Sequence, residues 1–469
     1  MLDAPFDLAA DLDTPVSAFL KLRPLGARVL LESVETGGTM RLGRYSFLGF
    51  GEARPVRLQD GELRDGDHVS PAPTSRDGLL HAMRRALDRS FRPVDRTGAV
   101  PDLPFTGGLV GAAGFDVLRR FDRVRTPARP GPAGHPELAY VSTRSLLVFD
   151  HLTRRAALLH DGTDAERNAL RHEVRAALRG PLPDRPPRGT LAPPTPTLGR
   201  DDFIAAVDVA QEHIRAGDLF QIVLSLRLAG ACDLSPFEVY RALRLLNPSP
   251  YMVYVDLEDV QLVGSSPEAL VRMQGGVAHL RPIAGTRPRG ATPDLDEALA
   301  QELLADPKEA AEHVMLVDLA RNDVGRVALP GTIEVAPFRS IERYSHVMHL
   351  VSGVRGAVRP DLDAFDVFAA AFPAGTVVGA PKLRAAEILA ELEPSGRGLY
   401  AGTVGYFGHG KRMDQAIAIR TMVFADGQVS FQAGAGIVAD SVAHREHDEC
   451  LHKGAALRAA LQLAAGGLA

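Results

Sequence analysis

The chain has 469 residues, and 45% of them are hydrophobic, which is enough apolar material for one large folded domain or two ordinary ones. Its 53 basic and 58 acidic residues give a net charge of −5, without any long run of one sign. This balance excludes the basic surface of a nucleic-acid-binding protein. The sequence has neither a signal-peptide pattern nor an apolar run long enough for a membrane span, so we expect a cytoplasmic protein with no membrane partner.

The two cysteines, Cys232 and Cys450, lie far apart and belong to no cluster with the spacing of a metal site. Disulfide frameworks and cysteine-rich metal sites both need several cysteines at short, regular intervals. We therefore expect two incidental thiols in a reducing compartment.

Three regions follow one another along the chain. Residues 1–180 show strand patterns at 28–33 and 45–50 and helical patterns at 77–91 and 164–178. Residues 181–197 contain seven prolines, which cannot donate backbone hydrogen bonds, so this stretch is predicted to be a surface connector. Residues 198–469 form the third region, which carries most of the motifs described below.

The third region alternates helical and strand-like patterns. It begins with an amphipathic helix at 200–216, and the strand patterns are often separated by short turns that contain glycine. Such a pattern favours an α+β fold, in which large antiparallel β-sheets form a sandwich with the helices outside. The strands are predicted at 220–227, 252–257, 277–283, 401–407, 415–424 and 429–435.

An acidic helix is predicted from Asp306 onward, with Asp306 as the N-cap and Pro307 at the first helical position. Glu309 and Glu312 are three residues apart and therefore lie on one face near the positive end of this helix. The apolar residues that follow indicate that the helix is substantially buried, where a carboxylate needs a partner. A structural alternative is that Glu309 closes a capping box onto Asp306.

A second acidic helix is predicted within residues 440–453, where Glu446 and Glu449 repeat the same three-residue spacing. Four carboxylates from two helices suit Mg²⁺, which prefers oxygen ligands and keeps water positions open for a substrate. The alternative is an exposed helix face on which Glu449 pairs with Lys453 one turn later.

Three motifs carry a family resemblance: Lys308 to His313, Asp318 to Asp323 and Gly434 to Ser441. They are similar to the chorismate-binding domain of anthranilate synthase component I, in the family of chorismate-utilising enzymes. The likeness is dense over residues 200–460 and thinner before them, and it implies the fold of that family. It also implies that Mg²⁺ grips the ring carboxylate of chorismate, held by Glu309, Glu312, Glu446 and Glu449. The sequence departs from the family at Ala443-His444, where Pro-Glu is common.

The nucleophile is indicated by two positions. In the run Pro282 to Thr286, Ala284 stands where family members that make 4-amino-4-deoxychorismate carry Lys, and a methyl group cannot attack a substrate. Gln221 stands where isochorismate and salicylate synthases carry a Lys that activates water, and an amide cannot take a proton. With both groups missing, the resemblance implies that ammonia is the nucleophile.

The resemblance assigns further residues to the site. Glu268 matches the general acid that protonates the departing hydroxyl, so its pKa should be raised toward neutrality. His349 is expected to assist the expulsion of pyruvate, and Thr286 is grouped with Glu268, His349 and Gln221 as catalytic. An arginine in an apolar strand needs a carboxylate partner, which makes Arg420 a binding residue. The resemblance gives the substrate-binding set as Arg420, Tyr400, Thr376, Lys453 and the backbone of Gly436.

A regulatory pocket for tryptophan is also implied by the resemblance. Glu32 can meet an α-ammonium group, and Ser33 can donate a hydrogen bond. Pro250 and Met252 offer apolar walls for an indole ring, although the prolines here can equally form a turn and Met252 can belong to the core. The predicted set is Glu32, Ser33, Arg44, Pro250, Tyr251 and Met252.

The implied activity is the conversion of chorismate and ammonia into anthranilate and pyruvate with Mg²⁺, under feedback inhibition by tryptophan. We recognise no glutamine-hydrolysing module with a Cys nucleophile in the sequence, so a separate glutamine amidotransferase subunit is the expected source of ammonia. Two enzymatic alternatives remain: a 4-amino-4-deoxychorismate synthase, which Ala284 disfavours, and an isochorismate synthase, which Gln221 disfavours. A non-catalytic tryptophan-sensing relative is the third, and the retained acidic residues argue against it.

Overall fold

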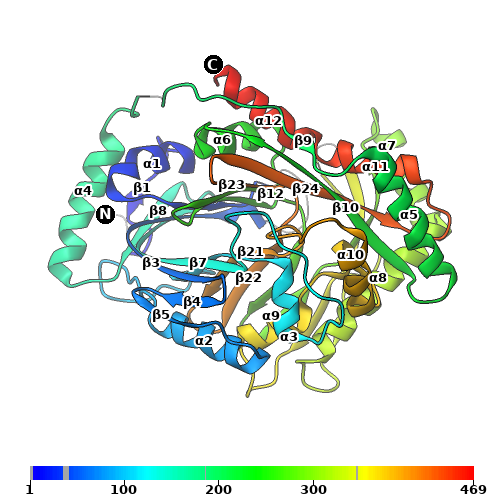
Figure 1. Cartoon of the computed structure of the whole chain (residues 1–469). Coiled ribbons are helices and arrows are strands. Elements are labelled where there is room, and N and C mark those ends of the chain that lie inside the picture. The colour runs from blue at the N-terminus through cyan, green and yellow to red at the C-terminus, as the bar shows by residue number, and fades with distance from the viewer. Residues whose placement is uncertain (1–3, 35–41, 185, 345–346, 469) are drawn as a thin grey trace.

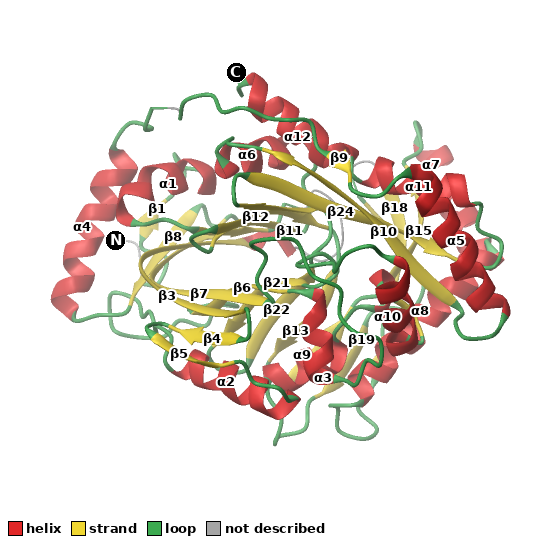
Figure 2. Ribbon diagram, viewed as in Figure 1, coloured by secondary structure: helices red, strands yellow, loops and turns green. Residues whose placement is uncertain are grey.

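The computed structural model describes residues 4–34, 42–184, 186–344 and 347–468. Strands form the centre of the molecule and helices surround them, as Figure 2 shows in yellow and red. The predicted α+β class with antiparallel sheet and outer helices is confirmed. The two layers of the sandwich belong to one continuous sheet that curls back on itself.

The large sheet is antiparallel throughout, and its main path of hydrogen-bonded neighbours runs β10, β24, β23, β12, β11, β2, β3, β7, β6, β21, β22, β13, β14, β19. Its strands are β1 (Leu8–Ala9), β2 (Val29–Glu32), β3 (Tyr45–Gln59), β4 (Glu62–Asp65), β5 (His68–Pro71), β6 (Gly108–Ala113), β7 (Leu138–Asp150), β8 (Arg155–His160), β9 (Thr195–Pro196), β10 (Gln221–Ala231), β11 (Tyr251–Asp256), β12 (Val260–Ser266), β13 (Ala269–Gln274), β14 (Val277–Leu280), β16 (Glu334–Val335), β19 (Val354–Ala357), β20 (Gly379–Ala380), β21 (Thr403–Gly408), β22 (Arg412–Ile417), β23 (Thr421–Ala425) and β24 (Gln428–Ile437).

The curl follows from the alternation of side chains along the strands. In β2, Val29 and Leu31 point into a core enclosed by the sheet, whereas Leu30 points outward to a core covered by helices. The enclosed core collects side chains from β11, β12 and β23 and also from β6, β21 and β22, which lie far apart along the path of the sheet. A sheet buried on both faces in this way needs strands that are apolar at nearly every position. Strand β6 meets this requirement, since all of its residues are buried.

The helices lie outside the sheet, as Figure 1 shows, and pack in two groups. One core joins Phe19 of α1, Phe237 of α6 and Leu461 of α12 to the sheet, and the other joins helices around α8, α9 and α10. The helices are α1 (Pro15–Leu22), α2 (Arg76–Asp88), α3 (Leu118–Phe121), α4 (Asp164–Arg179), α5 (Arg200–Arg215), α6 (Pro236–Leu246), α7 (Pro293–Ala305), α8 (Pro307–Gly325), α9 (Ala364–Ala371), α10 (Lys382–Leu392), α11 (Ala443–Lys453) and α12 (Ala455–Gly466).

The regions before and after the connector share the sheet. Strand β2 pairs with β11, and β6 pairs with β21. The regions on both sides of the connector therefore contribute strands to one hydrogen-bonded sheet. The connector itself runs along the edge of β10, where β9 pairs with Leu228 and Ala229 and the Thr197 amide donates to the Arg227 carbonyl over 2.9 Å. Despite its prolines, the connector thus keeps enough backbone N–H groups to form hydrogen bonds with β10. The division of the chain at 181–197 stays a prediction.

A second, smaller sheet carries two of the predicted catalytic residues. It consists of β15 (Ile283–Pro288), β18 (Val347–Val351) and β17 (Ser340–Arg343) in the order β15, β18, β17. The predicted strand at 277–283 is therefore wrong in its extent, because the chain leaves β14 at Leu280 and starts this sheet at Ile283.

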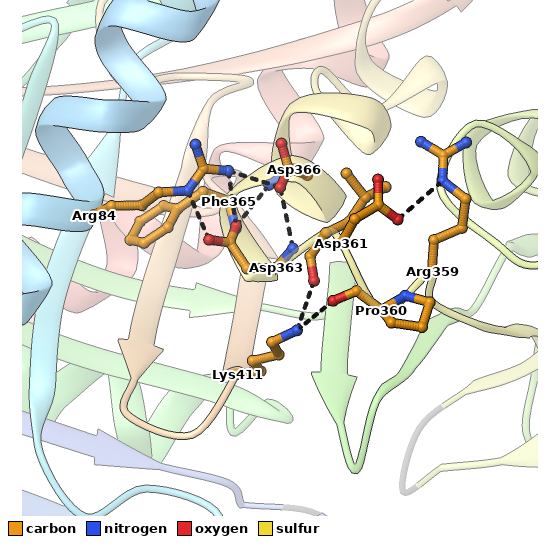
Figure 3. Close-up of polar contacts among 9 residues, drawn as sticks. Arg84, Arg359, Pro360, Asp361, Asp363, Phe365, Asp366 and Lys411 are labelled. Carbon is orange, nitrogen blue, oxygen red and sulfur yellow. Dashed lines mark hydrogen bonds and ion pairs between the residues drawn. The ribbon is translucent and has the colours of Figure 1, made fainter.

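Helix α9, which leads toward the segment that carries Thr376, is fixed at its N-terminus by an ionic clamp (Figure 3). The Arg84 guanidinium of α2 lies 2.7 Å from Asp363 and 2.7 Å from Asp366, and Asp363 also caps the helix through the Phe365 and Asp366 amides. Lys411 closes the adjacent loop by donating to the Pro360 carbonyl over 3.1 Å. Both carboxylates also lie at the positive end of the helix dipole. The acidic residues of the clamp therefore stabilise α9 in two ways, through the capping hydrogen bonds and through their interaction with the dipole.

We expect Arg84→Ala to lower the free energy of unfolding by about 1–2 kcal/mol, because the clamp is only partly shielded from water. Chemical denaturation monitored by circular dichroism measures this change, and Arg155→Ala on strand β8, outside the clamp, serves as the control. An Arg84→Ala protein as stable as the wild type would contradict a structural role for the clamp.

Candidate active site

Helix α8 begins as the sequence predicts. The Asp306 side chain accepts hydrogen bonds from the amides of Lys308 and Glu309, and Pro307 occupies the first turn. The N-cap is therefore confirmed, and the first turn shows this Asp cap instead of the capping box that was the alternative. Glu309 and Glu312 are half-buried on this helix.

Helix α11 begins at Ala443 with Val442 as an N-cap that makes no side-chain hydrogen bond. The missing cap agrees with the Ala443-His444 departure from the family pattern. Glu446 is half-buried and Glu449 is exposed. The alternative predicted for Glu449 is present, since Lys453 lies 2.7 Å from its carboxylate.

The two acidic helices interact electrostatically across the site. Burial raises the pKa of Glu312, and the negative charges of Glu309 and Glu449 raise it further. Burial also raises the pKa of Glu446, and the negative charge of Glu449 raises it further. The positive charge of Lys308 on α8 acts in the opposite direction. Carboxylates that raise one another's pKa repel each other when they are ionised, and this repulsion costs free energy. A bound cation would remove the repulsion.

The carboxylates fit a hard divalent cation by the chemistry of their donors, because they supply only oxygen ligands. In the part of the chain that the structure describes, no three His, Cys, Asp or Glu side chains stand close enough together to hold a metal as they are. Two of the carboxylates are instead engaged by cations, Glu449 by Lys453 and Glu309 by Arg287 at 3.4 Å. Metal binding would therefore require these two ion pairs to loosen.

An open cavity of about 730 Å³ lies beside α11. Arg420 reaches it from the bend between β22 and β23, and Glu449 and Lys453 reach it from α11, so one hollow joins a predicted metal residue to two predicted substrate-binding residues. Lys453 also donates to the Gly434 carbonyl over 2.9 Å. Asn247 and His452 also line the cavity, and neither was predicted as a residue of the active site.

Arg420 differs from its prediction in one respect. The expected strand at 415–424 is wrong, because β22 ends at Ile417 and β23 begins at Thr421, with Arg420 in a bend at a φ of +47°. Residues with a Cβ rarely adopt this left-handed conformation, and backbone strain of this kind is one of the features that cluster at functional sites. The bend turns the guanidinium into the open cavity, where nearby protein atoms still remove enough water to lower its pKa.

Glu268 lies just before β13, and its carboxylate accepts a hydrogen bond from the Thr376 hydroxyl over 3.1 Å. Burial raises its pKa to about 7, and both the Thr376 hydrogen bond and the positive charge of Arg420 act against that rise. The carboxyl group is therefore partly protonated at neutral pH, as a general acid requires. A further cavity of about 50 Å³ adjoins Glu268 and Thr376.

His349 and Thr286 face each other across the small sheet. The His349 Nδ1 atom lies 3.1 Å from the Thr286 hydroxyl and 3.1 Å from the Gly285 carbonyl. Since a carbonyl can only accept a hydrogen bond, Nδ1 carries the proton and Nε2 is left as a base. Burial and the charge of Arg420 lower the pKa of His349, which keeps the imidazole neutral.

The contact with the Gly285 carbonyl depends on a β-bulge, where the pairing of β15 with β18 shifts between Ala284 and Thr286. Gly285 adopts a φ of +61°, and a side chain there would come within 2.7 Å of Leu303. Glycine is thus required at this point of the run.

Gln221 and Tyr400 both meet the strand β24. A Cβ atom on Gly436 would lie only 2.6 Å from the amide nitrogen of Gln221. A Cβ atom on Gly434 would lie only 2.7 Å from the hydroxyl of Tyr400. The two glycines therefore let these side chains approach the backbone closely. Except for the metal carboxylates, the predicted catalytic and binding residues thus form two groups. In one, the charge of Arg420 acts both on the hydrogen-bonded pair of Glu268 and Thr376 and on the pair of His349 and Thr286, and the other group lies along β24.

The predicted regulatory residues line a separate cavity of about 110 Å³ between β2, β11, β21 and β22. Glu32, Ser33, Pro250, Tyr251 and Met252 all contribute to it, whereas Arg44 is not among its lining residues and pairs with Asp150 at 2.9 Å. The Ser33 hydroxyl is buried without a hydrogen-bond partner among the described residues.

Glu32 is already satisfied within the protein. Its buried carboxylate accepts hydrogen bonds from Tyr240 and from Arg244, whose Nε lies 2.9 Å away. A second carboxylate, Asp414 of β22, lies in the same cavity, and the Tyr251 hydroxyl donates to it over 3.1 Å. Burial raises the pKa of Asp414 to about 6. Sequence reasoning missed Asp414, because Arg412 and Gln415 lie in the same strand and nothing in this mixed pattern marks the acid as buried.

No helix within the described residues is long and apolar enough to cross a membrane.

Comparisons with known proteins identify the family. The family model described as chorismate binding enzyme matches residues 27–459. Anthranilate synthase component 1 from Thermus thermophilus is 47% identical over 465 residues, which cover 98% of this chain and 97% of that protein. The corresponding protein from Acinetobacter calcoaceticus is 42% identical, with 98% and 95% covered. The name component 1 implies a complex of more than one component.

The fold agrees with solved structures. Anthranilate synthase component I from Streptococcus pneumoniae superimposes with a TM-score of 0.78 at 35% identity, covering 90% of this chain and 93% of that one. The menaquinone-specific isochorismate synthase from Escherichia coli has a TM-score of 0.69 at 19% identity, with 96% and 92% covered, and shares the fold alone. The chain therefore belongs to the chorismate-binding enzyme family and, within it, to the anthranilate synthase component 1 enzymes.

Proposed function

We propose that this chain converts chorismate and ammonia into anthranilate and pyruvate, with Mg²⁺ bound between the acidic helices α8 and α11. The observation that carries the proposal is Glu268, a carboxyl group with a pKa of about 7 that is hydrogen-bonded to Thr376 and within reach of the charge of Arg420. An acid of this strength can protonate a leaving hydroxyl at neutral pH.

Glu309, Glu312, Glu446 and Glu449 are the residues that would hold the metal. When bound, Mg²⁺ would neutralise and orient the ring carboxylate of the substrate. The open cavity supports this placement, because Glu449 shares it with Arg420 and Lys453, two cations suited to the carboxylates of chorismate. The Lys453 ammonium could then move from Glu449 to the substrate.

The remaining steps rest on this chain's own side chains. Glu268 gives its proton to the C4 hydroxyl, which leaves as water while ammonia adds at C2. His349 Nε2 is a neutral base suited to assist the loss of pyruvate and aromatisation of the ring, because its Nδ1 is fixed by the Gly285 carbonyl. Ala284 and Gln221 offer no competing nucleophile or base for water, which disfavours the two related synthases.

The proposal is tested with purified protein, chorismate, Mg²⁺ and an ammonium salt. Fluorescent anthranilate should form together with an equal amount of pyruvate, and a chelator should stop the reaction. Formation of an amino-deoxychorismate or of isochorismate in its place would reject the proposal. A glutamine amidotransferase subunit is the proposed physiological source of ammonia, so glutamine should replace the salt only when that partner is added.

Tryptophan is the proposed inhibitor at the cavity of Ser33 and Met252. We expect Ser33→Ala to raise the inhibition constant of tryptophan by about tenfold through loss of one hydrogen bond, with nearly normal uninhibited turnover. Glu32→Ala is a poorer test, since it leaves the Arg244 guanidinium unpaired and should destabilise the fold. Steady-state inhibition assays decide the matter, and an equal loss of turnover and inhibition would instead give Ser33 a structural role.

A further inference from the structure

One buried ion pair contacts the elements that carry both groups of predicted site residues. The Arg397 guanidinium donates two parallel hydrogen bonds to the Glu393 carboxylate, over 2.8 and 2.7 Å, and both side chains are buried. Glu393 is the C-cap of α10, and Arg397 follows it in the loop that leads to Tyr400. Apolar residues of similar volume often stabilise a fold at least as well as a buried ion pair, so stability alone does not explain this one.

The remaining hydrogen bonds of Arg397 hold two backbone segments together. Its Nη1 donates to the Val377 carbonyl over 2.7 Å, and its Nη2 donates to the Val223 carbonyl over 2.6 Å. Val377 follows Thr376 in the chain, and Val223 lies on β10, the strand that begins at Gln221. The guanidinium therefore ties the segment that presents Thr376 to the large sheet. Its planar fork can form all of these bonds at once, whereas a lysine ammonium is a point charge on a flexible stem.

Arg397 also contacts Tyr400 directly. Its guanidinium lies over the Tyr400 ring, 5.5 Å from the ring centroid, and over the Phe115 ring at 5.0 Å. The Arg397 carbonyl accepts a hydrogen bond from the Tyr400 amide over 3.2 Å. The cation–π contact and this hydrogen bond together orient the ring whose hydroxyl meets β24 at Gly434.

Glu393 connects the ion pair to β24. Its carboxylate accepts hydrogen bonds from the Ser225 amide over 3.0 Å and from the Ser225 hydroxyl over 2.6 Å. The Ser225 hydroxyl accepts a hydrogen bond from the Gln432 amide over 2.7 Å, and Gln432 lies on β24 two residues before Gly434. The four side chains of this network, Arg397 included, are all buried. A buried network in which the members hydrogen-bond one another is rigid, so it can fix the relative position of the elements it joins.

We propose that Arg397 is a positioning residue that holds Thr376 against Glu268. Its contact with Tyr400 gives it the same role toward the substrate-binding group along β24. The inference rests on the proposed function, in which Glu268 is the general acid. The Thr376 hydroxyl donates to the Glu268 carboxylate over 3.1 Å, and this hydrogen bond lowers the pKa of Glu268 because it favours the ionised form. Displacement of Thr376 should therefore raise that pKa.

The test is the pH dependence of turnover at saturating chorismate, Mg²⁺ and ammonium salt. Arg397→Lys keeps a positive charge opposite Glu393 but lacks the planar fork, so folded protein is expected. The decline of turnover at alkaline pH should move to a pH higher by about 0.7, the effect of one lost hydrogen bond to Glu268. The KM for chorismate should rise by about threefold, because the contact that orients Tyr400 is weakened.

Two further variants show whether the effect passes through Thr376. Thr376→Val removes the hydroxyl itself and should move the decline equally, and its combination with Arg397→Lys should move it no further. Arg120→Lys on α3 is the matched control. Arg120 likewise donates a fork to a carboxylate, that of Glu137 over 3.0 and 2.8 Å, and a hydrogen bond to the Pro73 carbonyl. This control should keep the wild-type pH profile and KM, since α3 carries no predicted site residue.

A milder variant acts at the other end of the network and does not depend on the folding of Arg397→Lys. Ser225→Ala removes one donor to Glu393 and should move the decline in the same direction by a smaller amount. If neither Arg397→Lys nor Ser225→Ala moves the decline, or if the effects of Arg397→Lys and Thr376→Val add, Arg397 has a structural role alone. Wild-type protein that makes no anthranilate, or a decline that persists in Glu268→Gln, would instead reject the proposed function.

Discussion

Glu268→Gln is expected to lower the turnover of chorismate by about a thousandfold while leaving its binding nearly unchanged, because the amide keeps the shape of the side chain but has no acidic proton to give. In the wild type, the carboxyl group has a pKa of about 7 and accepts a hydrogen bond from Thr376. Steady-state kinetics with an ammonium salt measure the loss of turnover, and calorimetry measures chorismate binding.

The pH dependence supplies a control for this variant. A general acid works only while protonated, so wild-type turnover should decline as the pH rises above about 7, where Glu268 ionises. The residual activity of Glu268→Gln should lack this decline. A variant with near-normal turnover, or one that keeps the same decline, would contradict the role of Glu268.

The same carboxyl group should make the wild type less stable at alkaline pH. Its pKa is raised from 4.5 to about 7 by folding, so the folded protein binds more protons than the unfolded chain between these values and loses stability as the pH rises through them. The loss amounts to about 3 kcal/mol above pH 7. Glu268→Gln should therefore melt at a higher temperature than the wild type at pH 8, and the difference should shrink at pH 5.

Replacing Glu312 and Glu446 together by Gln is expected to lower turnover at a fixed Mg²⁺ concentration by about a hundredfold or more, since two oxygen ligands lose their charge. Burial and neighbouring carboxylates raise the pKa of both residues, so the double variant should also be more stable than the wild type when no metal is added. Thermal melts with and without Mg²⁺ separate these effects, because a metal that binds the folded state raises the melting temperature.

The control for the acidic helices is Glu334→Gln on strand β16, an exposed residue paired with Arg355 at 2.7 Å. It removes the same charge outside the site and should leave both turnover and the Mg²⁺ effect unchanged. The proposed metal site is contradicted if the double variant responds to Mg²⁺ as the wild type does.

Local signals in the sequence predict local structure well. The start of α8 follows from Asp306 and Pro307, because capping and the fixed φ of proline act within one turn. The bend at Arg420 was predicted as strand, since the apolar alternation continues through it and nothing local marks a left-handed residue. The curl of the sheet depends on pairings such as β6 with β21, which join segments far apart in the sequence.

The candidate site was predicted in its members but only partly in its geometry. Motifs recognised by resemblance named Glu268 and Thr376 separately, and the structure adds the hydrogen bond between them and the burial that sets the pKa. Asp414 was missed, because the side chains around it come from elements distant in sequence. The ion pairs of Arg44 and of Glu32 were hidden for the same reason.

The most direct test of the activity uses ¹⁵N-labelled ammonium with chorismate, Mg²⁺ and the purified chain, followed by NMR and mass spectrometry of the product. The account predicts anthranilate that carries the label in the amino group next to the ring carboxylate, with unlabelled pyruvate released. A product with the label opposite the carboxylate, or one with oxygen from water at C2 and no label, would contradict it.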